Sequence, residues 1–249
     1  MFESNLELLR LKQALKDFFA LSSCTGIALG FSGGVDSAVC LKLLVDSIRK
    51  EKIIVLLMPE KKNKITSECE NYCNELGVKY FVIELNSLIS SFSCILWKES
   101  FIANANLKAR LRMLLLYHYT NSNNFLVCGT GNKSELMLGY FTKFGDGAND
   151  FLPLGSLYKT QVIELAKELN VPKKFIERIP SAGLWENQTD EKELGANYEL
   201  IDEILINVFD KNISFSELKK KKKFPEKILL SLEKRINSNK HKISLPKIL

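Results

Sequence analysis

The sequence lacks the features that mark membrane, secreted or low-complexity proteins. Its 249 residues include only two histidines, and neither an internal repeat nor a hinge rich in proline and glycine divides them. No stretch has the uncharged length of about 20 residues that a bilayer span requires. The opening segment 1–19 interleaves charged with apolar side chains, unlike a signal peptide. We therefore expect one domain, 1–249, in a cytoplasmic protein with no membrane partner.

The cysteines indicate neither disulfides nor a structural zinc. There are six, but the chain is neither short nor evidently secreted, and this favours free thiols. Cys69 and Cys73 lie four residues apart, yet no second pair of cysteine or histidine follows at zinc-site spacing. We expect no structural zinc.

The positive net charge is concentrated in one short segment. The formal charge is +6, and the lysine run 219–223 contributes five of these charges. No glycine–arginine repeats or interleaved aromatic residues accompany the run, so a solvated helix end or loop is favoured over a nucleic-acid surface. We expect no nucleic-acid partner, although the sequence does not assign the run a role.

Short apolar runs alternate with segments of helical periodicity. With 46% hydrophobic and 26% charged residues, the composition is that of a globular protein with one substantial core. The patterns predict strands at 26–31, 53–58, 80–85 and 125–128, and helices at 6–19, 37–49, 66–76, 106–119, 196–209 and 225–236. This alternation predicts an α/β fold, a doubly wound parallel sheet with helices on both faces.

One loop between a predicted strand and its helix is suited to bind phosphate. Its residues are Gly30, Phe31, Ser32, Gly33, Gly34, Val35, Asp36 and Ser37. Paired glycines let backbone N–H groups close on an anion, hydroxyls add donors, and the helix N-terminus adds partial positive charge. Asp36 would repel phosphate unless a divalent cation bridged them, so we assign it Mg²⁺. The alternative is a plain glycine-rich turn.

Two common nucleotide-binding motifs are absent. The tripeptide Gly-Lys-Ser/Thr of the Walker loop occurs nowhere in the chain. The run 129–131 begins a dinucleotide-binding fingerprint, but Ser134 stands where its third glycine would be. Both classes are excluded.

The segment 32–37 resembles the pyrophosphate loop of the N-type ATP pyrophosphatases. Members of that superfamily, which has a Rossmann-like fold of the adenine nucleotide alpha hydrolase type, cleave ATP between its α and β phosphates. Three further segments resemble one family within it, the NAD synthetases, in order and spacing: 106–113, 129–150, and 180–185 with 188–191. The resemblance extends over most of the chain.

The resemblance implies roles for individual residues. Asp36 and Glu135 would hold Mg²⁺. The loop from Gly30 to Ser37 would bind ATP together with Thr130, Lys159 and Ser181. The dinucleotide would be bound by Arg110, Lys143, Asp150, His241 and Lys242.

Some of these roles stay open in the sequence. Lys108, Arg110 and Arg112 cannot all face one ligand, so Arg112 is an alternative to Arg110. Trp185 could stack on a ring, although tryptophan is more often a core residue. Ile243 follows His241-Lys242 where the family usually has a basic residue, and the lysine-rich segment 58–66 leaves adenine contacts unassigned.

The resemblance also implies the reaction. The nicotinate carboxylate of deamido-NAD would attack the α-phosphate of ATP, and ammonia would then displace AMP, with no covalent enzyme intermediate. Glutamine-dependent members carry an extra glutaminase domain, for which this length leaves no room, so we expect free ammonia, or ammonia from a separate protein, as the nitrogen source. A homodimer is implied as well.

Two other classes remain as alternatives. One is an RNA-modifying enzyme that adenylates a tRNA base for thiolation or lysidine formation. The basic run is its best support, but neither paired reactive cysteines nor an RNA-binding appendage is evident. The other is a nucleotide-binding module without catalysis.

Overall fold

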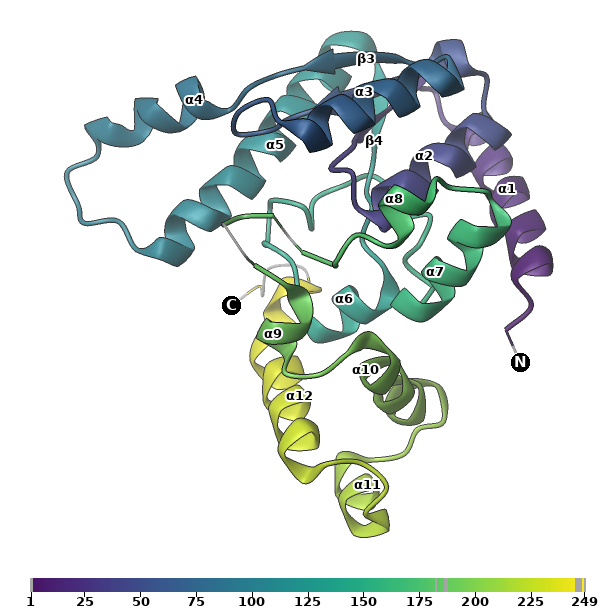
Figure 1. Ribbon diagram of the computed structural model, residues 1–249, viewed down its shortest axis with the longest axis vertical. Helices are drawn as coiled ribbons and strands as arrows, with labels where there is room; N and C mark the ends of the chain where they lie inside the picture. Colours follow the sequence, from purple (N-terminus) through teal and green to yellow (C-terminus); the bar gives the residue numbers. More distant parts are fainter. Residues whose placement is uncertain (1, 182, 186–187, 245–247, 249) are drawn as a thin grey trace.

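A parallel sheet of four strands forms the centre of the protein (Figure 1). The computed structural model describes residues 2–181, 183–185, 188–244 and 248. The strands are β1 (Gly26–Gly30), β2 (Ile53–Leu57), β3 (Lys79–Val82) and β4 (Phe125–Cys128), in the order β3-β2-β1-β4. In this register Leu29 pairs with Val55 on one side and with Cys128 on the other. The predicted parallel sheet is confirmed.

The third strand is shorter than the predicted segment 80–85. It ends at Val82, although the N–H of Leu85 still donates to the carbonyl of Pro59 over 2.9 Å. The helix α4 (Asn86–Ser90) begins directly afterwards and takes the backbone away from the sheet.

Alternate side chains of each strand face opposite layers, as the two-residue period of a strand requires. Ile27 and Leu29 pack into a core with α1 (Ser4–Leu21), α2 (Val35–Ser47), α3 (Lys64–Leu76), α7 (Lys159–Glu168) and α8 (Lys173–Ile176). Ala28 and Val127 face the long helix α5 (Phe101–Asn123) on the other side. Helices therefore cover both faces, as predicted, and the short turn η1 (Lys50–Lys52) leads into β2.

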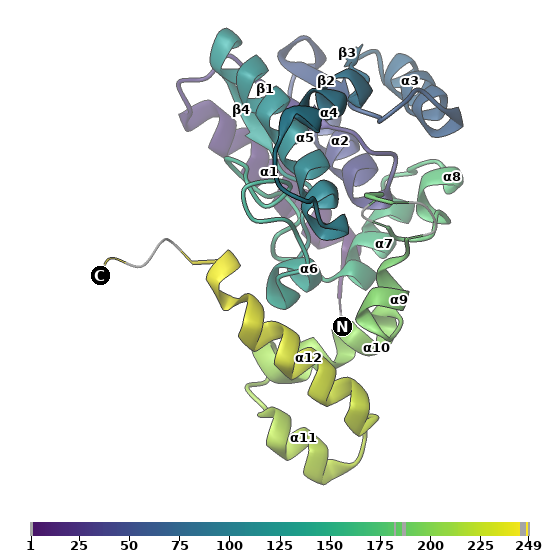
Figure 2. The same cartoon turned by 90° about the vertical axis from the view of Figure 1, so that its left-hand side faces the viewer.

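The elements between residues 190 and 242 form a helical cluster below the sheet (Figures 1 and 2). Its elements are α9 (Asp190–Leu194), α10 (Tyr198–Leu205), the π-helical turn η3 (Ile206–Asp210), α11 (Phe215–Lys221), α12 (Glu226–Asn239) and η4 (Lys240–Lys242). The cluster is joined to the sheet layer through α6 (Lys133–Leu138) and α7, which α10 and α12 contact. The predicted helices at 196–209 and 225–236 are confirmed, the first ending in the π turn.

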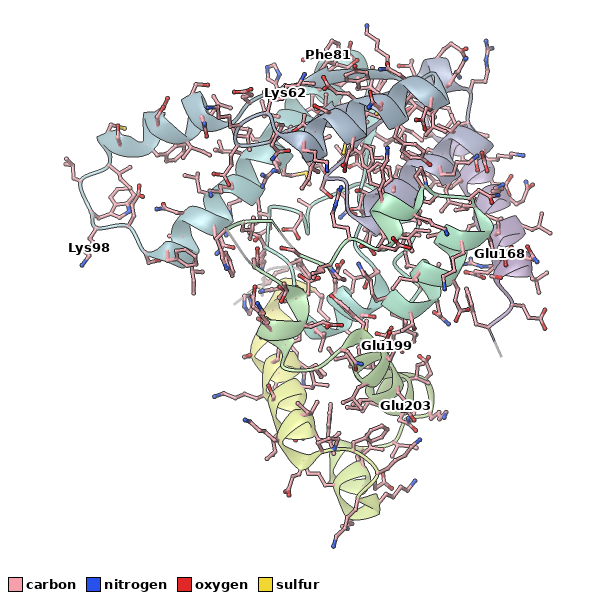
Figure 3. The ribbon with its side chains drawn as sticks, in the orientation of Figure 1. Lys62, Phe81, Lys98, Glu168, Glu199 and Glu203 are labelled. Atoms are coloured by element: carbon pink, nitrogen blue, oxygen red, sulfur yellow. The ribbon has the colours of Figure 1, made fainter. Side chains whose placement is uncertain are left out.

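A helical arm, residues 86–105, projects from the body (Figure 1). It consists of α4, the turn η2 (Ser91–Cys94), a connecting loop and the first turns of α5. Lys98 lies near its tip (Figure 3). Leu96 and Trp97 there are 99% and 71% exposed, so the arm presents apolar side chains to solvent.

The strand order creates a topological switch point between β1 and β4. From β1 the chain passes through α2 to β2 on one side, whereas β4 lies on the other side of β1. Loops leaving the carboxyl ends of two such strands diverge and leave a crevice where ligands bind. The predicted phosphate loop follows β1 and the segment 129–134 follows β4, so both lie at this crevice.

The described residues bear on three features that the sequence does not predict: disulfides, a structural zinc and a membrane-spanning helix. All six cysteines are free. Within the described part of the chain, no group of three or more cysteine, histidine or acidic side chains is arranged to hold a metal, and no helix is both long enough and apolar enough to cross a bilayer.

Candidate active site

The loop after β1 forms a cradle of donors at the start of α2. Gly33 adopts a left-handed backbone conformation with φ of +81°. Gly34 then caps α2, and within the described residues no side chain caps the helix in its place. The hydroxyls of Ser32 and Ser37 lie 3.2 Å apart across the loop. Uncapped N–H groups and converging hydroxyls at a helix N-terminus are an arrangement that binds anions.

Asp36, in the first turn of α2, is held from two directions. Its Oδ2 forms an ion pair with Nζ of Lys159, the first residue of α7, and this lysine side chain is only 3% exposed. Its Oδ1 accepts a hydrogen bond of 2.9 Å from the side-chain amide of Asn132. The site thus joins the starts of α2, α6 and α7.

Glu135 lies in the first turn of α6, beside Asp36. Asn132 caps this helix through a 3.0 Å bond from the N–H of Glu135, and Glu135 accepts the N–H of Asn132 over 3.1 Å in return. Burial, followed by repulsion from Asp36, raises the pKa of Glu135 well above its ordinary value. Burial acts to lower the pKa of Lys159, but attraction from Asp36 and then Glu135 outweighs it and the pKa is raised.

Two carboxylates close to one lysine fit a magnesium site. Mg²⁺ is usually held by one or two carboxylates and completed by waters and substrate phosphate oxygens. Asp36 and Glu135 supply such a pair, and a bound cation would relieve the repulsion between their charges. The oxygens of a carboxylate have about four lone-pair positions, so the bonds to Lys159 and Asn132 leave Asp36 capacity to coordinate a cation.

Asp202 fixes the start of α7 from below. This side chain is 1% exposed, and its Oδ1 accepts a 2.5 Å bond from the hydroxyl of Ser134. Its Oδ2 accepts the N–H of Thr160 over 2.8 Å, while the Ser134 hydroxyl accepts the N–H of Lys159. The first N–H groups of α7 are thus satisfied, and Lys159 is positioned toward Asp36.

Asp190 brings a third carboxylate near the buried lysine. It is 4% exposed and accepts hydroxyl bonds from Tyr198 over 3.0 Å and from Tyr140 over 3.2 Å. Nζ of Lys159 lies 5.5 Å from the ring centroid of Tyr198. Burial raises the pKa of Asp190, whereas the charge of Lys159 acts to lower it.

Sequence reasoning assigned no role to Asn132, Asp202 or Tyr198. The pattern Asn-x-x-Glu at 132–135 is a helix-capping signal, which would have placed Asn132 at the start of α6. No local pattern reveals that Asp202 reaches Ser134, because that contact depends on tertiary packing.

Four predicted dinucleotide-binding residues lie around the loop 139–155. The guanidinium of Arg110 donates to the carbonyl of Lys143 over 3.3 Å. Nζ of Lys143 donates to the carbonyl of His241 over 2.7 Å. Nζ of Lys242 donates to the carbonyls of Gly139 and Phe141. The C-terminal His-Lys pair therefore packs on the loop near Arg110.

Asp150 is bonded elsewhere. Its Oδ2 accepts the N–H of Val127 over 2.7 Å, and its Oδ1 accepts the hydroxyl of Tyr117 over 3.2 Å. The carboxylate thereby ties the end of the long loop to β4.

The three cations of α5 diverge, as expected from their spacing. Arg112 is half-buried and donates to the carbonyl of Met58, and Lys108 binds Glu60 over 2.6 Å and the carbonyl of Leu184 over 3.0 Å. Arg110 is the exposed member of the three. Of the two arginines, Arg110 is therefore the more accessible to a ligand.

The remaining predicted residues contribute in different ways. Phe31 and Val35 are each 4% exposed and pack into the core, so only their backbone could contact a ligand. Thr130 is half-buried after β4. Ser181 is exposed and accepts the N–H of Gly183 over 3.1 Å. The ring of Trp185 contacts Phe101 of the arm, with centroids 5.1 Å apart.

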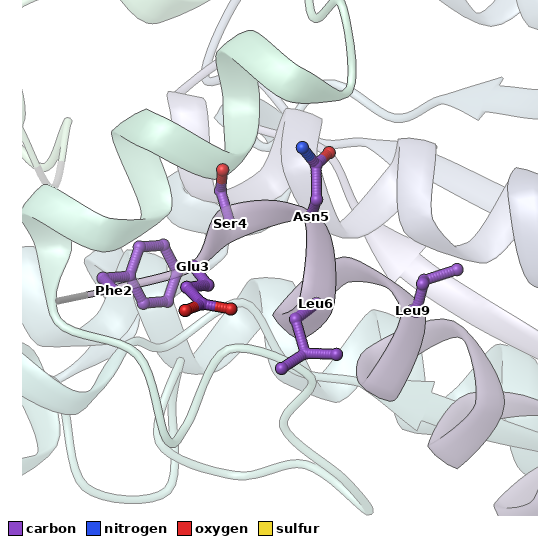
Figure 4. A pocket seen from close by; sticks show the side chains of 6 residues that line it. All are labelled: Phe2, Glu3, Ser4, Asn5, Leu6 and Leu9. Atoms are coloured by element: carbon purple, nitrogen blue, oxygen red, sulfur yellow. The ribbon is translucent and has the colours of Figure 1, made fainter.

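A surface hollow of about 500 Å³ lies away from this site, at the first turn of α1 (Figure 4). It is lined by Phe2, Glu3, Ser4, Asn5, Leu6 and Leu9. None of these is a predicted site residue. The candidate active site is instead the group of polar side chains where α2, α6 and α7 begin, at the switch point of the sheet.

The chain is similar to known proteins over nearly its whole length. The family model of NAD synthase matches residues 7–246. The NH(3)-dependent NAD(+) synthetase of Archaeoglobus fulgidus is 43% identical over 99% of this chain and 96% of that protein. The corresponding synthetase of Methanocaldococcus jannaschii is 41% identical over 90% of this chain and 89% of that protein.

Two solved structures have similar folds over their full length. The NMN synthetase from Francisella tularensis has a TM-score of 0.86 and 32% identity, covering 100% of this chain and 99% of that one. The NH3-dependent NAD synthetase from Campylobacter jejuni has a TM-score of 0.84 and 31% identity, and both chains are covered completely.

The contacts of Asp202 lead to a prediction about stability. Asp202→Ala should lower the free energy of unfolding by about 2–4 kcal/mol, because a buried hydroxyl and a buried N–H lose their acceptor. Asp202→Asn should cost less, since an amide can still accept one bond and donate another. Urea unfolding measures both, with the exposed Asp17→Ala as the control. An unfolding free energy of Asp202→Ala equal to that of the control would contradict the assignment.

Proposed function

Because the chain belongs to the NAD synthase family, we propose that it uses ATP to adenylate the nicotinate carboxylate of deamido-NAD and then displaces AMP with ammonia. The products are NAD, AMP and pyrophosphate, and the enzyme is an amide-forming ligase. One observation carries the proposal: the donor cradle after β1 lies beside the Asp36–Glu135 pair at the switch point. The matching relatives are named as NH(3)-dependent NAD(+) synthetases.

The first step releases pyrophosphate, and the site supplies positive potential for it. The N–H groups of the loop and the start of α2 would bind the phosphate oxygens together with Ser32 and Ser37. Lys159 would add a fixed cation next to Asp36, and Thr130 and Ser181 would contact ATP. Magnesium held by Asp36 and Glu135 would neutralise charge on the leaving pyrophosphate.

The second step needs a closed site and a bound dinucleotide. Arg110, Lys143, His241 and Lys242 are grouped at the loop 139–155, and we assign them to deamido-NAD together with Asp150. A planar guanidinium such as that of Arg110 suits phosphate or carboxylate. Closure of this loop over the adenylate would exclude water and limit its hydrolysis.

The tRNA-modifying alternative gains no support. Lys219 pairs with Glu233 over 2.7 Å, and Lys223 pairs with Glu203 over 2.5 Å. The basic run is therefore partly neutralised within the helical cluster. That the enzyme is a single domain, 1–249, in the cytoplasm stays a prediction.

The similarity to an NMN synthetase suggests a second candidate substrate for adenylation. This is nicotinate mononucleotide, which carries the same nicotinate carboxylate. The relatives favour the dinucleotide, since the NAD synthetases of Archaeoglobus fulgidus and Methanocaldococcus jannaschii are 43% and 41% identical to this chain. The acceptor is decided by the assay below.

The purified protein should form NAD and AMP from deamido-NAD, ATP, Mg²⁺ and ammonium. Mass spectrometry of the products measures this, with nicotinate mononucleotide in a parallel reaction. Glutamine should not replace ammonium, and removal of Mg²⁺ with EDTA should abolish turnover. Absence of AMP would refute the ligase assignment, and preferential formation of NMN would reassign the acceptor.

The buried lysine should be required for the adenylation step. Lys159→Met should lower the rate of pyrophosphate–ATP exchange by about 10²–10³-fold, because a preorganised cation at the developing charge is lost. Asp36→Asn should lower the same rate while the protein stays folded. Lys167→Met, an exposed substitution on the same helix, is the control. Exchange at the control rate in Lys159→Met would exclude Lys159 from this step.

We also propose a homodimer formed through the arm. Support comes from Leu96, Trp97 and Ile102, which are 99%, 71% and 68% exposed in this chain. Exposed apolar side chains carried by one projecting element are a feature of protein interfaces. The double variant Trp97→Asp, Ile102→Asp should shift the protein from dimer to monomer in sedimentation velocity. Leu230→Asp, at an exposed position of α12, should leave the dimer intact; a dimer in both variants contradicts the proposed interface.

A further inference from the structure

Arg178 forms a hydrogen bond to the phosphate loop from its outer side. It lies after α8, and its Nη1 donates to the carbonyl oxygen of Gly33 over 2.5 Å. Its Nη2 pairs with Glu68 of α3, also at 2.5 Å. The side chains of Arg178 and Glu68 are both 23% exposed, so the ion pair between them is partly shielded from water. Neither residue has a role in the mechanism described above.

We propose that Arg178 is a positioning residue for pyrophosphate, holding the peptide between Gly33 and Gly34 so that its N–H faces the anion site. The proposal rests on the proposed function. In a planar trans peptide the C=O and the N–H point in opposite directions. With the Gly33 carbonyl directed at Arg178, the Gly34 N–H points into the loop, where it donates to the Ser32 hydroxyl over 3.3 Å.

The two glycines explain why this peptide needs to be held in place. We call the bond from Arg178 to the Gly33 carbonyl the clamp. A peptide flanked by glycines rotates more easily than any other, because neither residue has a Cβ to restrict it. Rotation would turn the carbonyl oxygen of Gly33 toward the phosphates and replace a donor by a repelling acceptor. The bond from Arg178 makes that rotation costly.

Arg178 is itself held in place. Its guanidinium carbon lies 5.5 Å from the ring centroid of Phe175, which is fully buried. Phe175 packs in turn against Phe31 of the loop, with centroids 5.4 Å apart. The fork of the guanidinium therefore reaches Gly33 and Glu68 from one fixed orientation, a geometry that a lysine ammonium does not reproduce.

The guanidinium also acts through the peptide it binds. A cation at a carbonyl oxygen polarises the amide, and polarised hydrogen-bonding groups donate more strongly. Arg178 thus strengthens the Gly34 N–H as a donor while remaining on the far side of the peptide. It precedes Ser181 by three residues, so it also couples the position of that segment to the loop.

The experiment compares Arg178→Met and Arg178→Lys with wild type and with Arg49→Met, a control at an exposed position. Isothermal titration with pyrophosphate and Mg²⁺ measures binding, and steady-state kinetics measure KM for ATP and for deamido-NAD. Arg178→Met should weaken pyrophosphate binding and raise the KM for ATP about tenfold or more, as expected for a lost charge-assisted bond. The KM for deamido-NAD should stay near wild type. Arg178→Lys should recover only part of the affinity.

Each contrary result has a defined meaning. Wild-type pyrophosphate affinity in Arg178→Met overturns the inference, and so does an equal rise in both KM values, which indicates a general structural role. Full recovery in Arg178→Lys shows that charge alone matters and also overturns it. If Arg178→Met does not fold, Arg178→Lys and Glu68→Gln replace it in the pyrophosphate titration. Wild-type affinity for pyrophosphate in both variants overturns the inference.

The proposed function is tested separately. Wild-type protein that makes NAD, with unchanged pyrophosphate binding in the Arg178 variants, removes this inference alone. Wild-type protein that makes no NAD, with weakened pyrophosphate binding in Arg178→Met, removes the assigned reaction and leaves the clamp.

Discussion

The ion pair between Lys159 and Asp36 is the interaction on which the candidate site depends. A lysine that is 3% exposed is tolerated only when opposite charge compensates its lost hydration. Asp36 provides this directly, and Glu135 and Asp190 add to it. The compensation is reciprocal, because the same lysine reduces the repulsion among three acidic groups. The starts of α2, α6 and α7 are therefore constrained to meet at one point, beside the crevice of the sheet.

The lower helical cluster is part of this constraint as well as a support for it. Asp202 and Tyr198 belong to α10, yet Asp202 bonds the first turn of α7 and Tyr198 bonds Asp190. A site at the carboxyl ends of a parallel sheet normally draws on the loops that leave the strands. Here the loops provide the phosphate cradle, while a separate core fixes the cation that faces it.

The sequence predicted what depends on local pattern. Strands and flanking helices follow from periodicity, and the loop from Gly30 to Ser37 follows from residues adjacent in the chain. Burial of Lys159 did not follow, because a lysine at a helix start is usually solvated and its partners lie 123 residues away at Asp36 and 24 residues away at Glu135. The helix α4 was not predicted, because it is short and only Ile89 of its two apolar residues packs against the core. Arg110 and Arg112 could be told apart only once Met58 was placed.

The phosphate loop is held from two sides by one stretch of chain. Lys159, at the start of α7, binds Asp36 within the site, and Arg178, just after α8, binds the outer carbonyl of Gly33. A loop with two glycines is entropically costly to order. Because Lys159 and Arg178 hold the loop before ATP binds, the entropic cost of ordering it is met during folding and does not reduce the affinity for ATP. The packing of Phe175 between Arg178 and Phe31 therefore bears on ATP binding although none of its atoms lies in the cradle.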